Sequence, residues 1–547
     1  MAAACLGASP CQSQVSMRGF CCVAASSAAK PLPTCDPPVL ETPKMATELN
    51  RFLTPLDAAF LYVERPNETM HIGGCMVYEG EFSREYMVEQ LAARMHLLPR
   101  YRQRVLFPPF FVSHPVWVDD PAFNLEKHVE EVWIPEDSDH QVLARAAAEA
   151  YGGMLDRNRP LWKGILLRGI PGHTAVVWKI HHAMVDGVSG VDLSMVLSDF
   201  SPTEELPEAP AESWTPKPLP DSLSLLQEAM QHRLGQLNES WTNAAFDAAR
   251  PRLMADRVRE MVAASSATLP VSAAPAPRTV FNRPVSKERG FAWAQFSFPE
   301  LRAVKSALGG TVNDVVLTTL AGGIGRYLRE RGQDTKGLEL RAMCPVSMRQ
   351  QDERGQLGNL VSNMIAPLFV GVDDPVKRLG RERDAMNKLK EAGQAKAFYQ
   401  MTQFGDRVPP LMAAVAATMP FSQTLFNTVS TNVPGPMIPL YFGPHKLVDW
   451  LPLGIVSNNI GLFVAILSYN QRITLGMTVD AKLIPDPWFL AQCLEESYAE
   501  LREAAGVEGE EPTGALCFAA AAPQVEVPEA EEATATTDSD SSLRGVA

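Results

Sequence analysis

The chain has 547 residues, of which 46% are hydrophobic and 20% charged, a composition typical of a globular protein with room for two or more domains. Its formal net charge is −14, and residues 507–547 carry nine acids and one arginine, so −8 of that charge lies in the tail. The remaining body is mildly acidic without a basic stripe, which argues against nucleic-acid binding.

The cysteines and the apolar stretches indicate the redox compartment and whether a membrane-spanning helix is expected. Five of the nine cysteines lie in the first 35 residues, and the others show no paired spacing, which fits a reducing compartment. No stretch reaches the roughly 18 to 20 apolar residues of a membrane-spanning helix. The nearest, residues 408–426, is interrupted by Pro409, Pro410 and Pro420. We therefore expect no spanning helix.

Residues 1–44 differ in composition from the rest of the chain. They are rich in Ala, Ser, Cys and Pro and contain no acid before Asp36. This predicts a leader or a disordered extension. The lack of acids fits a plastid or mitochondrial transit peptide, whereas the scarcity of arginine favours plain disorder, and Met45 is an alternative start.

The first folded part is expected to begin near Phe52 and to occupy residues 45–200. Its sequence alternates between helical and strand patterns. Helices are predicted from residue 55 and over 85–96, 143–154 and 191–200, and strands over 70–78, 165–167 and 174–180. This alternation predicts an α/β or α+β fold, in which helices cover mixed sheets.

Residues 201–281 are expected to be a linker with one helix. The segments 201–220 and 264–277 are rich in Pro, Ser, Glu or Ala. Between them, apolar residues recur at helical spacing: Leu223, Leu226, Met230, Leu234 and Leu237. We predict an amphipathic crossover helix that docks through these residues on the core. A membrane-surface role is the alternative, and it is less favoured because the polar face is not strongly basic.

Residues 282–506 are expected to form a second α/β half. Helices are predicted over 313–331, 375–394 and 487–505, and strands over 338–346, 428–432, 463–469 and 474–480. The acidic, Ala-rich residues 507–547 cannot bury enough apolar surface to fold and should be disordered.

The residues best suited to catalysis are concentrated in one segment, Lys179-Ile180-His181-His182-Ala183-Met184-Val185-Asp186-Gly187. A neutral imidazole, with pKa near 6.5, can take a proton from a hydroxyl. Asp186 can lock the turn that aims it, and Gly187 permits a backbone angle that other residues resist. Purely structural histidines are the alternative. A metal site is not expected, because His181 and His182, adjacent on a strand, point to opposite faces and no Cys or Glu cluster completes a ligand set.

The pattern His-His-x-x-x-Asp-Gly resembles the signature of the CoA-dependent acyltransferase superfamily, which includes wax ester synthases and the condensation domains of peptide synthetases. Further segments resemble the bifunctional wax ester synthase/diacylglycerol acyltransferase family. They are residues 54–60, 70–74, 160–162, 311–317, 340–347, 358–359, 431–436 and 461–462. The resemblance covers about residues 52–505. One departure is Thr431, where the family typically has Ser, which keeps a hydroxyl.

The resemblance implies two chloramphenicol-acetyltransferase-like halves with a site at their interface, reached by a tunnel. It implies acyl-CoA as co-substrate without a further cofactor, and a long-chain alcohol or diacylglycerol as acceptor. Such acceptors imply peripheral contact with a membrane or lipid droplet, such as the endoplasmic reticulum or plasma membrane surface. Two alternative functions remain open. One is an acyltransferase or condensation-type enzyme with another acceptor, and the other is a noncatalytic lipid-binding protein with the same fold.

The motif matches also assign roles to residues. His182 is expected to be the general base, with His181 packed behind the site and Asp186 ordering the loop. No Gly-x-Ser-x-Gly elbow is present, so direct attack in a ternary complex is favoured, and Cys75 and Cys344 are interpreted as core residues. Asn313 is a candidate oxyanion donor or an N-cap. The full set expected to bind substrate is Gly187, Asn313, Asp314, Asn432, Gly435, Pro160 and Trp162, where Trp162 is equally well a core residue.

Overall fold

The structure is a computed structural model that describes residues 50–135, 139–185, 187–207, 214–248, 275–347, 361–396, 398–399, 408–419 and 425–509. The predictions for residues 1–44, for most of 507–547 and for Asp186 lie outside these residues. Among the residues it describes, no helix is both long and apolar enough to cross a membrane.

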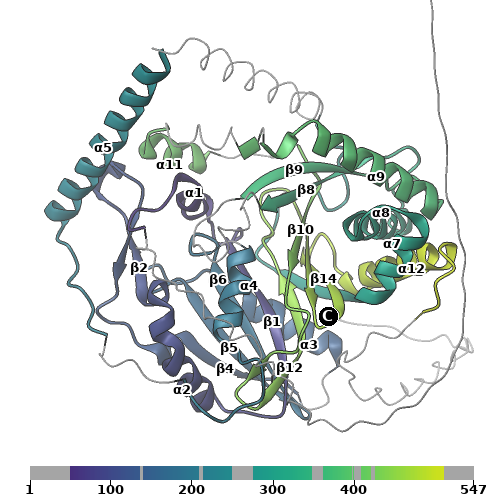
Figure 1. Ribbon diagram of the computed structural model, residues 1–547, viewed down its shortest axis with the longest axis horizontal. Helices are drawn as coiled ribbons and strands as arrows, with labels where there is room; N and C mark the ends of the chain where they lie inside the picture. Colours follow the sequence, from purple (N-terminus) through teal and green to yellow (C-terminus); the bar gives the residue numbers. More distant parts are fainter. Residues whose placement is uncertain are drawn as a thin grey trace, which may run out of the picture. The chain divides into compact units, whose positions relative to one another are not determined.

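The first sheet has six strands in the order β11-β12-β1-β6-β5-β4 (Figure 1). Its strands are β1 (His71–Glu79), β4 (Val129–Trp133), β5 (Trp162–Ile170), β6 (His173–His181), β11 (Tyr441–Phe442) and β12 (His445–Leu453). Strand β1 lies in the middle, antiparallel to both β6 and β12. Gly73 is required there, because a Cβ at this position would lie 1.8 Å from the carbonyl oxygen of Trp178 on β6.

Helices cover both faces of this sheet. Helix α3 (His140–Tyr151) packs on one face with the inward residues Cys75, Val77 and Val177. The other face carries α1 (Pro55–Val63), α2 (Arg84–Arg94) and α4 (Gly187–Val196). Four short 3-10 helices, η1 (Met95–Leu97), η2 (Pro99–Arg102), η3 (Pro109–Phe111) and η4 (Leu125–His128), and the β2 (Gln103–Leu106) and β3 (Val116–Asp119) pair complete this half.

The second sheet also has six strands, in the order β7-β14-β13-β10-β8-β9. They are β7 (Arg289–Ser297), β8 (Leu340–Ser347), β9 (Val361–Leu368), β10 (Thr428–Pro434), β13 (Leu462–Tyr469) and β14 (Arg472–Asp480). Strand β10 runs parallel to β13 and β8, and the other pairs are antiparallel. Along β13, Val464 and Ile466 enter the core under the helices, whereas Phe463 and Ala465 point to the opposite face.

The helices over the second sheet are α7 (Phe298–Leu308), α8 (Val312–Glu330), α9 (Pro375–Glu391) and α12 (Pro487–Ala504). A further helix, α11 (Pro410–Thr418), lies against α1 (Figure 1). The prediction of mixed sheets with flanking helices is therefore confirmed, and the predicted helices and strands lie within a few residues of the observed ones.

The first sheet contains two strands that come from the C-terminal part of the chain. Residues 441–453 belong by sequence to the expected C-terminal half 282–506, but β11 and β12 hydrogen-bond into the first sheet, where Gly73 pairs with Leu453 and Met76 with Trp450. Strand β12 also packs against β13 and β14 of the second sheet. The return from β10 to β13 thus covers the open edge of β1, which removes an exposed edge from a buried apolar strand.

The crossover helix corrects one prediction. Helix α5 (Ser222–Ala248) forms where the spacing predicts it. However, Leu223, Met230, Leu234 and Leu237 are exposed, and the buried contacts are made by Leu225 and Ala229. Four of the five predicted core-docking residues therefore face away from the core, whereas Leu226 is half-buried, because the packing surface is supplied by Val116 and Val118 of β3 beneath the other side of the helix.

Candidate active site

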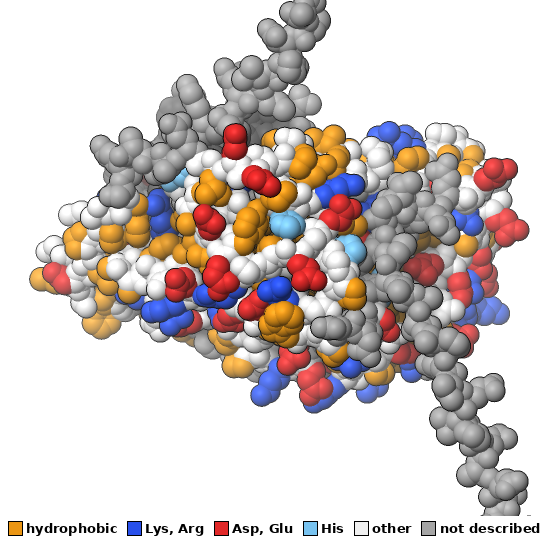
Figure 2. Space-filling view, turned by 90° about the horizontal axis from the view of Figure 1, so that it is seen from below, with side chains coloured by type: hydrophobic (Ala, Val, Ile, Leu, Met, Phe, Trp, Pro, Cys, Tyr) orange, Lys and Arg blue, Asp and Glu red, His pale blue; other side chains and the backbone are white. Residues whose placement is uncertain are grey.

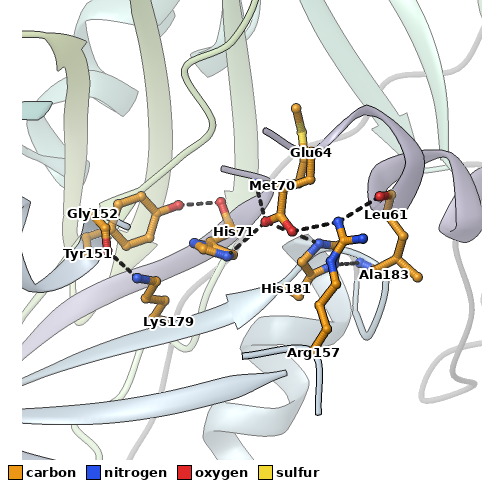
Figure 3. Close-up of polar contacts among 10 residues, drawn as sticks. All are labelled: Leu61, Glu64, Met70, His71, Tyr151, Gly152, Arg157, Lys179, His181 and Ala183. Carbon is orange, nitrogen blue, oxygen red and sulfur yellow. Dashed lines mark hydrogen bonds and ion pairs between the residues drawn. The ribbon is translucent and has the colours of Figure 1, made fainter. Parts of the chain in front are cut away.

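Two histidines face each other where adjacent strands end. His71 is the first residue of β1 and His181 the last of β6, and the antiparallel register pairs them directly. Neither side chain is exposed, and their rings meet edge to face with centroids 5.8 Å apart. The hydroxyl of Tyr151, from α3, donates to the carbonyl oxygen of His71 and holds the start of β1 (Figure 3).

A buried carboxylate lies between these imidazoles. Oε1 of Glu64, the residue after α1, is 3.2 Å from Nε2 of His71 and 3.5 Å from Nε2 of His181 (Figure 3). The same oxygen accepts the Met70 backbone N–H, and Oε2 lies 2.9 Å from Nη2 of Arg157. Arg157 also donates to the carbonyl oxygen of Leu61 at 2.7 Å, so this cluster fastens the end of α1 to the ends of β1 and β6.

The charge states in this cluster follow from its surroundings. Burial opposes ionisation of Glu64, but the facing imidazoles of His181 and His71 outweigh it and hold the pKa of Glu64 well below its usual range. Burial also lowers the pKa of His71 to about 4, although the Glu64 carboxylate opposes that shift. At neutral pH the cluster therefore contains a charged Glu64 and a neutral His71, with Arg157 as the compensating cation.

The two adjacent histidines of the motif have different environments. Nδ1 of His181 accepts the Ala183 N–H at 3.0 Å, and its Nε2 lies 3.5 Å from Oε1 of Glu64. His182 is half-buried, and its ring stacks on Phe60 of α1 with centroids 4.1 Å apart. Its backbone N–H donates to the carbonyl oxygen of Met70. The His181 ring is therefore fully enclosed, whereas His182 is partly exposed, and the catalytic roles expected of both stay predictions.

The turn after the histidines leads into α4. Gly187 is the first residue of that helix. It therefore takes helical backbone, which any residue adopts, instead of the special angle that the sequence suggested. Asp186 lies outside the described residues, so its expected role in ordering the loop stays a prediction.

The second half contributes two asparagines that the structure brings together. Nδ2 of Asn432, on β10, donates to Oδ1 of Asn313, near the start of α8, at 3.1 Å. This bond fixes which end of the Asn313 amide accepts, so Nδ2 is its donor end. Asn432 is exposed and Asn313 half-buried, and both are open to a bound molecule.

The start of α8 also corrects two interpretations. Thr311 is the N-cap, and it forms a capping box with Asp314, whose Oδ2 accepts from the Thr311 N–H and hydroxyl at 2.8 Å. The N-cap alternative for Asn313 is therefore wrong. Asp314 is buried and occupied by this cap, so it is a helix-capping residue in place of the predicted substrate contact.

The two sets of residues meet at the junction of the halves. Helix α4, which follows the histidines, contacts β10. Val433, next to Asn432, packs against the core cluster that contains Ala183, Met184 and Val185. His182 of the first half and the Asn313–Asn432 pair of the second half thus flank the same junction.

Trp162, Pro160 and Gly435, the remaining predicted substrate contacts, are closely packed in the structure. Trp162 is 1% exposed, its Nε1–H donates to the carbonyl oxygen of Tyr101, and its ring stacks on His128. Pro160 is buried beside it. Burial fits the core alternative for Trp162, but Trp162 also lines a cavity with Tyr101 and Ile180, so the substrate contacts expected of Trp162 and Pro160 stay predictions. Gly435 follows β10 at a close approach, because a Cβ there would lie 2.3 Å from the carbonyl oxygen of Ser468.

Thiol and metal chemistry have little support among the described residues. Burial raises the pKa of Cys75 and of Cys344 to about 12, so both thiols stay protonated and inert, in agreement with their interpretation as core residues. In the part of the chain that the structure describes, no group of three or more His, Cys, Asp or Glu residues has the geometry of a metal site.

Sequence reasoning missed Glu64, Arg157 and the role of His71. His71 lies in a segment that matched the family, which was the available signal. Glu64 and Arg157 gave no such signal, because an acid after a helix and an arginine in a loop are common. The contacts of Glu64 with Arg157 and His181 are long-range.

Comparison with known proteins agrees with this geometry. The family model described as the wax ester synthase/diacylglycerol acyltransferase catalytic domain matches residues 53–316, and the C-terminal domain model of that family matches residues 357–502. Two Mycobacterium tuberculosis proteins, each named "probable diacylglycerol O-acyltransferase", are similar along most of their length. One is 30% identical over 82% of this chain and 95% of its own, and the other 28% over 83% and 99%.

Solved structures share the fold. The wax ester synthase/diacylglycerol acyltransferase of Marinobacter aquaeolei VT8 matches with a TM-score of 0.57 and 24% identity, over 83% of this chain and all of that one. The first condensation domain of the calcium-dependent antibiotic synthetase matches with a TM-score of 0.52 and 14% identity, over 83% of this chain and 96% of its own. These likenesses confirm the expected fold of two chloramphenicol-acetyltransferase-like halves.

Proposed function

The chain belongs to the wax ester synthase/diacylglycerol acyltransferase family of acyltransferases, and we propose that it moves a long-chain acyl group from acyl-CoA to the hydroxyl of a fatty alcohol or of diacylglycerol. The observation that carries the proposal is the His181–His182 pair, in which a fully buried, anchored imidazole precedes a half-buried one at the junction of the halves. The names of the mycobacterial relatives support diacylglycerol as one acceptor.

His182 is the general base of the proposed reaction. Its ring takes the proton of the acceptor hydroxyl as that oxygen attacks the thioester carbonyl. The tetrahedral intermediate then collapses to the ester and CoA thiolate, which receives the proton from the imidazolium. Positioned general bases contribute about 100- to 10,000-fold to rate. The stack on Phe60 and the fastening of α1 through Glu64 support a fixed ring orientation.

The tetrahedral oxyanion needs a donor, and Asn313 is our candidate. The bond from Asn432 leaves the Nδ2 end of Asn313 to donate. Loss of one such donor typically costs about 100- to 1,000-fold in kcat. The thioester is already activated, so the reaction needs no cofactor beyond acyl-CoA as co-substrate. Direct attack in a ternary complex is supported by the protonated state of Cys75 and Cys344. The acceptors partition into lipid, so we also propose peripheral contact with a membrane or lipid droplet.

The test is an assay of the purified full-length protein with palmitoyl-CoA and either hexadecanol or dioleoylglycerol. We expect CoA release that depends on one or both acceptors, and the ratio of the two rates assigns the substrate. His182→Ala should lower the rate by about 100- to 10,000-fold with unchanged circular dichroism. His173→Ala, at the far end of β6, is the matched control and should keep the wild-type rate.

Two results would contradict the proposal. The absence of acceptor-dependent CoA release with both alcohols would reject the substrate class. A His182→Ala enzyme that keeps more than about a tenth of the wild-type rate would reject the base assignment alone.

A further inference from the structure

Among the described residues, helix α5 packs on the protein through one side. Leu225 is 5% exposed and contacts Val116 and Val118, and Ala229 is fully buried. His232, on the same side, stacks on Phe52 with ring centroids 3.8 Å apart. These contacts hold α5 to β3 and the segment before α1, and they leave the remaining sides of the helix to the surroundings (Figure 1).

The outer side of α5 carries a stripe of large apolar residues, which we call the α5 stripe. Its members and their exposed fractions are Leu223 66%, Met230 48%, Leu234 62%, Leu237 42% and Trp241 75%. At about 100° per residue, they fall within roughly 60° of one another and roughly 130° away from Leu225 and Ala229. Such a surface is unusual in a monomer that stays in water.

Two neighbouring elements also carry exposed apolar side chains. Short helix η3 contacts both α5 and α11. Phe110 in η3 is 80% exposed at a φ of 60°, a left-handed conformation that is unfavourable for a bulky residue. Helix α11 contains no charged residue, and Leu411 and Met412 are 50% and 62% exposed. The α5 stripe, Phe110, Leu411 and Met412 together are called the apolar face below.

The apolar face adjoins the helix that contacts the proposed base. Helix α11 packs on α1, and Nη2 of Arg65, just beyond α1, donates to the carbonyl oxygen of Ala417 at 3.1 Å. Helix α1 in turn carries Phe60, which stacks on His182. The face drawn in Figure 2, at the α2 and β12 side of the view in Figure 1, carries acidic, basic and hydrophobic side chains interspersed.

We propose that the apolar face docks the protein on a lipid surface, so that a lipid-dissolved acceptor reaches the site from that side; this inference rests on the proposed function. The side chains suit this occupant, because leucine and methionine enter the acyl boundary while tryptophan and phenylalanine sit at the headgroup level. The formal net charge of −14 opposes attraction to anionic lipids, so apolar contact must supply the binding. A lipid surface also needs no matched polar groups, and the stripe offers none.

The test is flotation of the full-length protein with dioleoylphosphatidylcholine vesicles, without acyl-CoA. The stripe variant is Leu234→Asp with Leu237→Asp. The matched control is Gln231→Asp with Asn238→Asp, two exposed polar positions on the same helix, which adds the same charge. We expect the wild type and the control to float, and the stripe variant to lose at least about tenfold in vesicle partitioning, because two leucine side chains no longer enter the lipid. Circular dichroism shows whether α5 remains folded, and Leu234→Ala with Leu237→Ala, which keeps helix propensity, should give a smaller loss in the same direction.

Each other outcome overturns the docking proposal. These are no flotation of the wild type, equal flotation of the stripe variant and the control, or an equal loss in both. A wild-type dimer in analytical ultracentrifugation that only the stripe variant loses, with flotation unchanged, would assign the face to a second copy. Acyl transfer to the water-soluble acceptor hexan-1-ol separates this proposal from the function. The stripe variant should keep it within about twofold, whereas a wild type that floats but transfers no acyl group to hexadecanol, dioleoylglycerol or hexan-1-ol would reject the function alone.

Discussion

The neighbouring imidazoles of His181 and His182, at the end of β6, differ in their surroundings. His181 is fixed between the Ala183 N–H and the Glu64 carboxylate, and His182 rests on Phe60 at the junction of the halves. The fully buried ring suits an orienting role, and the partly exposed ring of His182 is the one for which we propose proton transfer. The same division explains why Glu64, which cannot reach a substrate, matters to the site.

The buried cluster should make stability depend on pH. The pKa of His71 falls from 6.5 in the unfolded chain to about 4 in the folded one. Between these values the unfolded chain binds a proton that the folded protein does not, so stability is complete above pH 6.5 and is lost as pH falls toward 4, by at most about 3 kcal/mol. The lowered pKa of Glu64 acts in the same direction below its ordinary value of 4.5.

We expect His71→Gln to lower the melting temperature at pH 7 and to flatten its decline between pH 6.5 and 4.5, since the titrating group is gone. His173→Gln, at the exposed end of β6, is the control and should follow the wild-type curve. A His71→Gln protein with a decline as steep as wild type would show that His71 does not carry this dependence.

At the scale of elements, the capping box of α8 sets where the second half presents its amide. Thr311 and Asp314 satisfy each other's backbone groups, and this begins the helix at Val312, one residue before Asn313. Asn313 can then receive the bond from Asn432 on β10. Asn313, which is expected to bind substrate, and Asp314, which caps the helix, are thus consecutive in sequence.

Thr311→Ala should destabilise the protein by about 1 kcal/mol, because it removes one N-cap hydrogen bond at the start of a largely buried helix. Thr311→Ser keeps the hydroxyl and should remain within about 0.5 kcal/mol of wild type. Urea unfolding of the two variants measures the difference. Equal stability of Thr311→Ala and Thr311→Ser would mean that the cap does not hold this helix in place.

At the scale of the whole molecule, the halves are not independent. Strand β12 pairs with β1 along six residues and packs against β13 and β14. A buried ion pair between Asp449 of β12 and Arg472 of β14 joins the sheets at 2.5 Å. The first sheet therefore needs a strand that the chain reaches only near its end.

A fragment of residues 50–281 should consequently be insoluble or unfolded when expressed alone, because β1 becomes an exposed apolar edge. Co-expression with residues 282–509 should restore soluble protein in which the two fragments copurify. Soluble yield and circular dichroism of each preparation test this. A well-folded fragment 50–281 on its own would show that β12 is dispensable to the first sheet.

Much of the architecture follows from local patterns. Periodicity, caps and turn residues place helices α2, α3, α8, α9 and α12 and strands β1, β6, β13 and β14 within a few residues. The histidine motif and its companion segments indicate the family and point to His182. These features are readable because each depends on residues close together in the chain.

Long-range packing decided the rest. The spacing of Leu223 to Leu237 shows an apolar side of a helix, but only the position of Val116 and Val118 determines that another side is buried. The residue types of Glu64, His71 and His181 are visible in the sequence, whereas their contact requires the register of β1 against β6. The sequence by itself determined the family, the motif and the order of elements. The tertiary structure decided which histidine is accessible, which polar residues are caps or core, and how the halves share a strand, because burial and pairing depend on segments that meet only after folding.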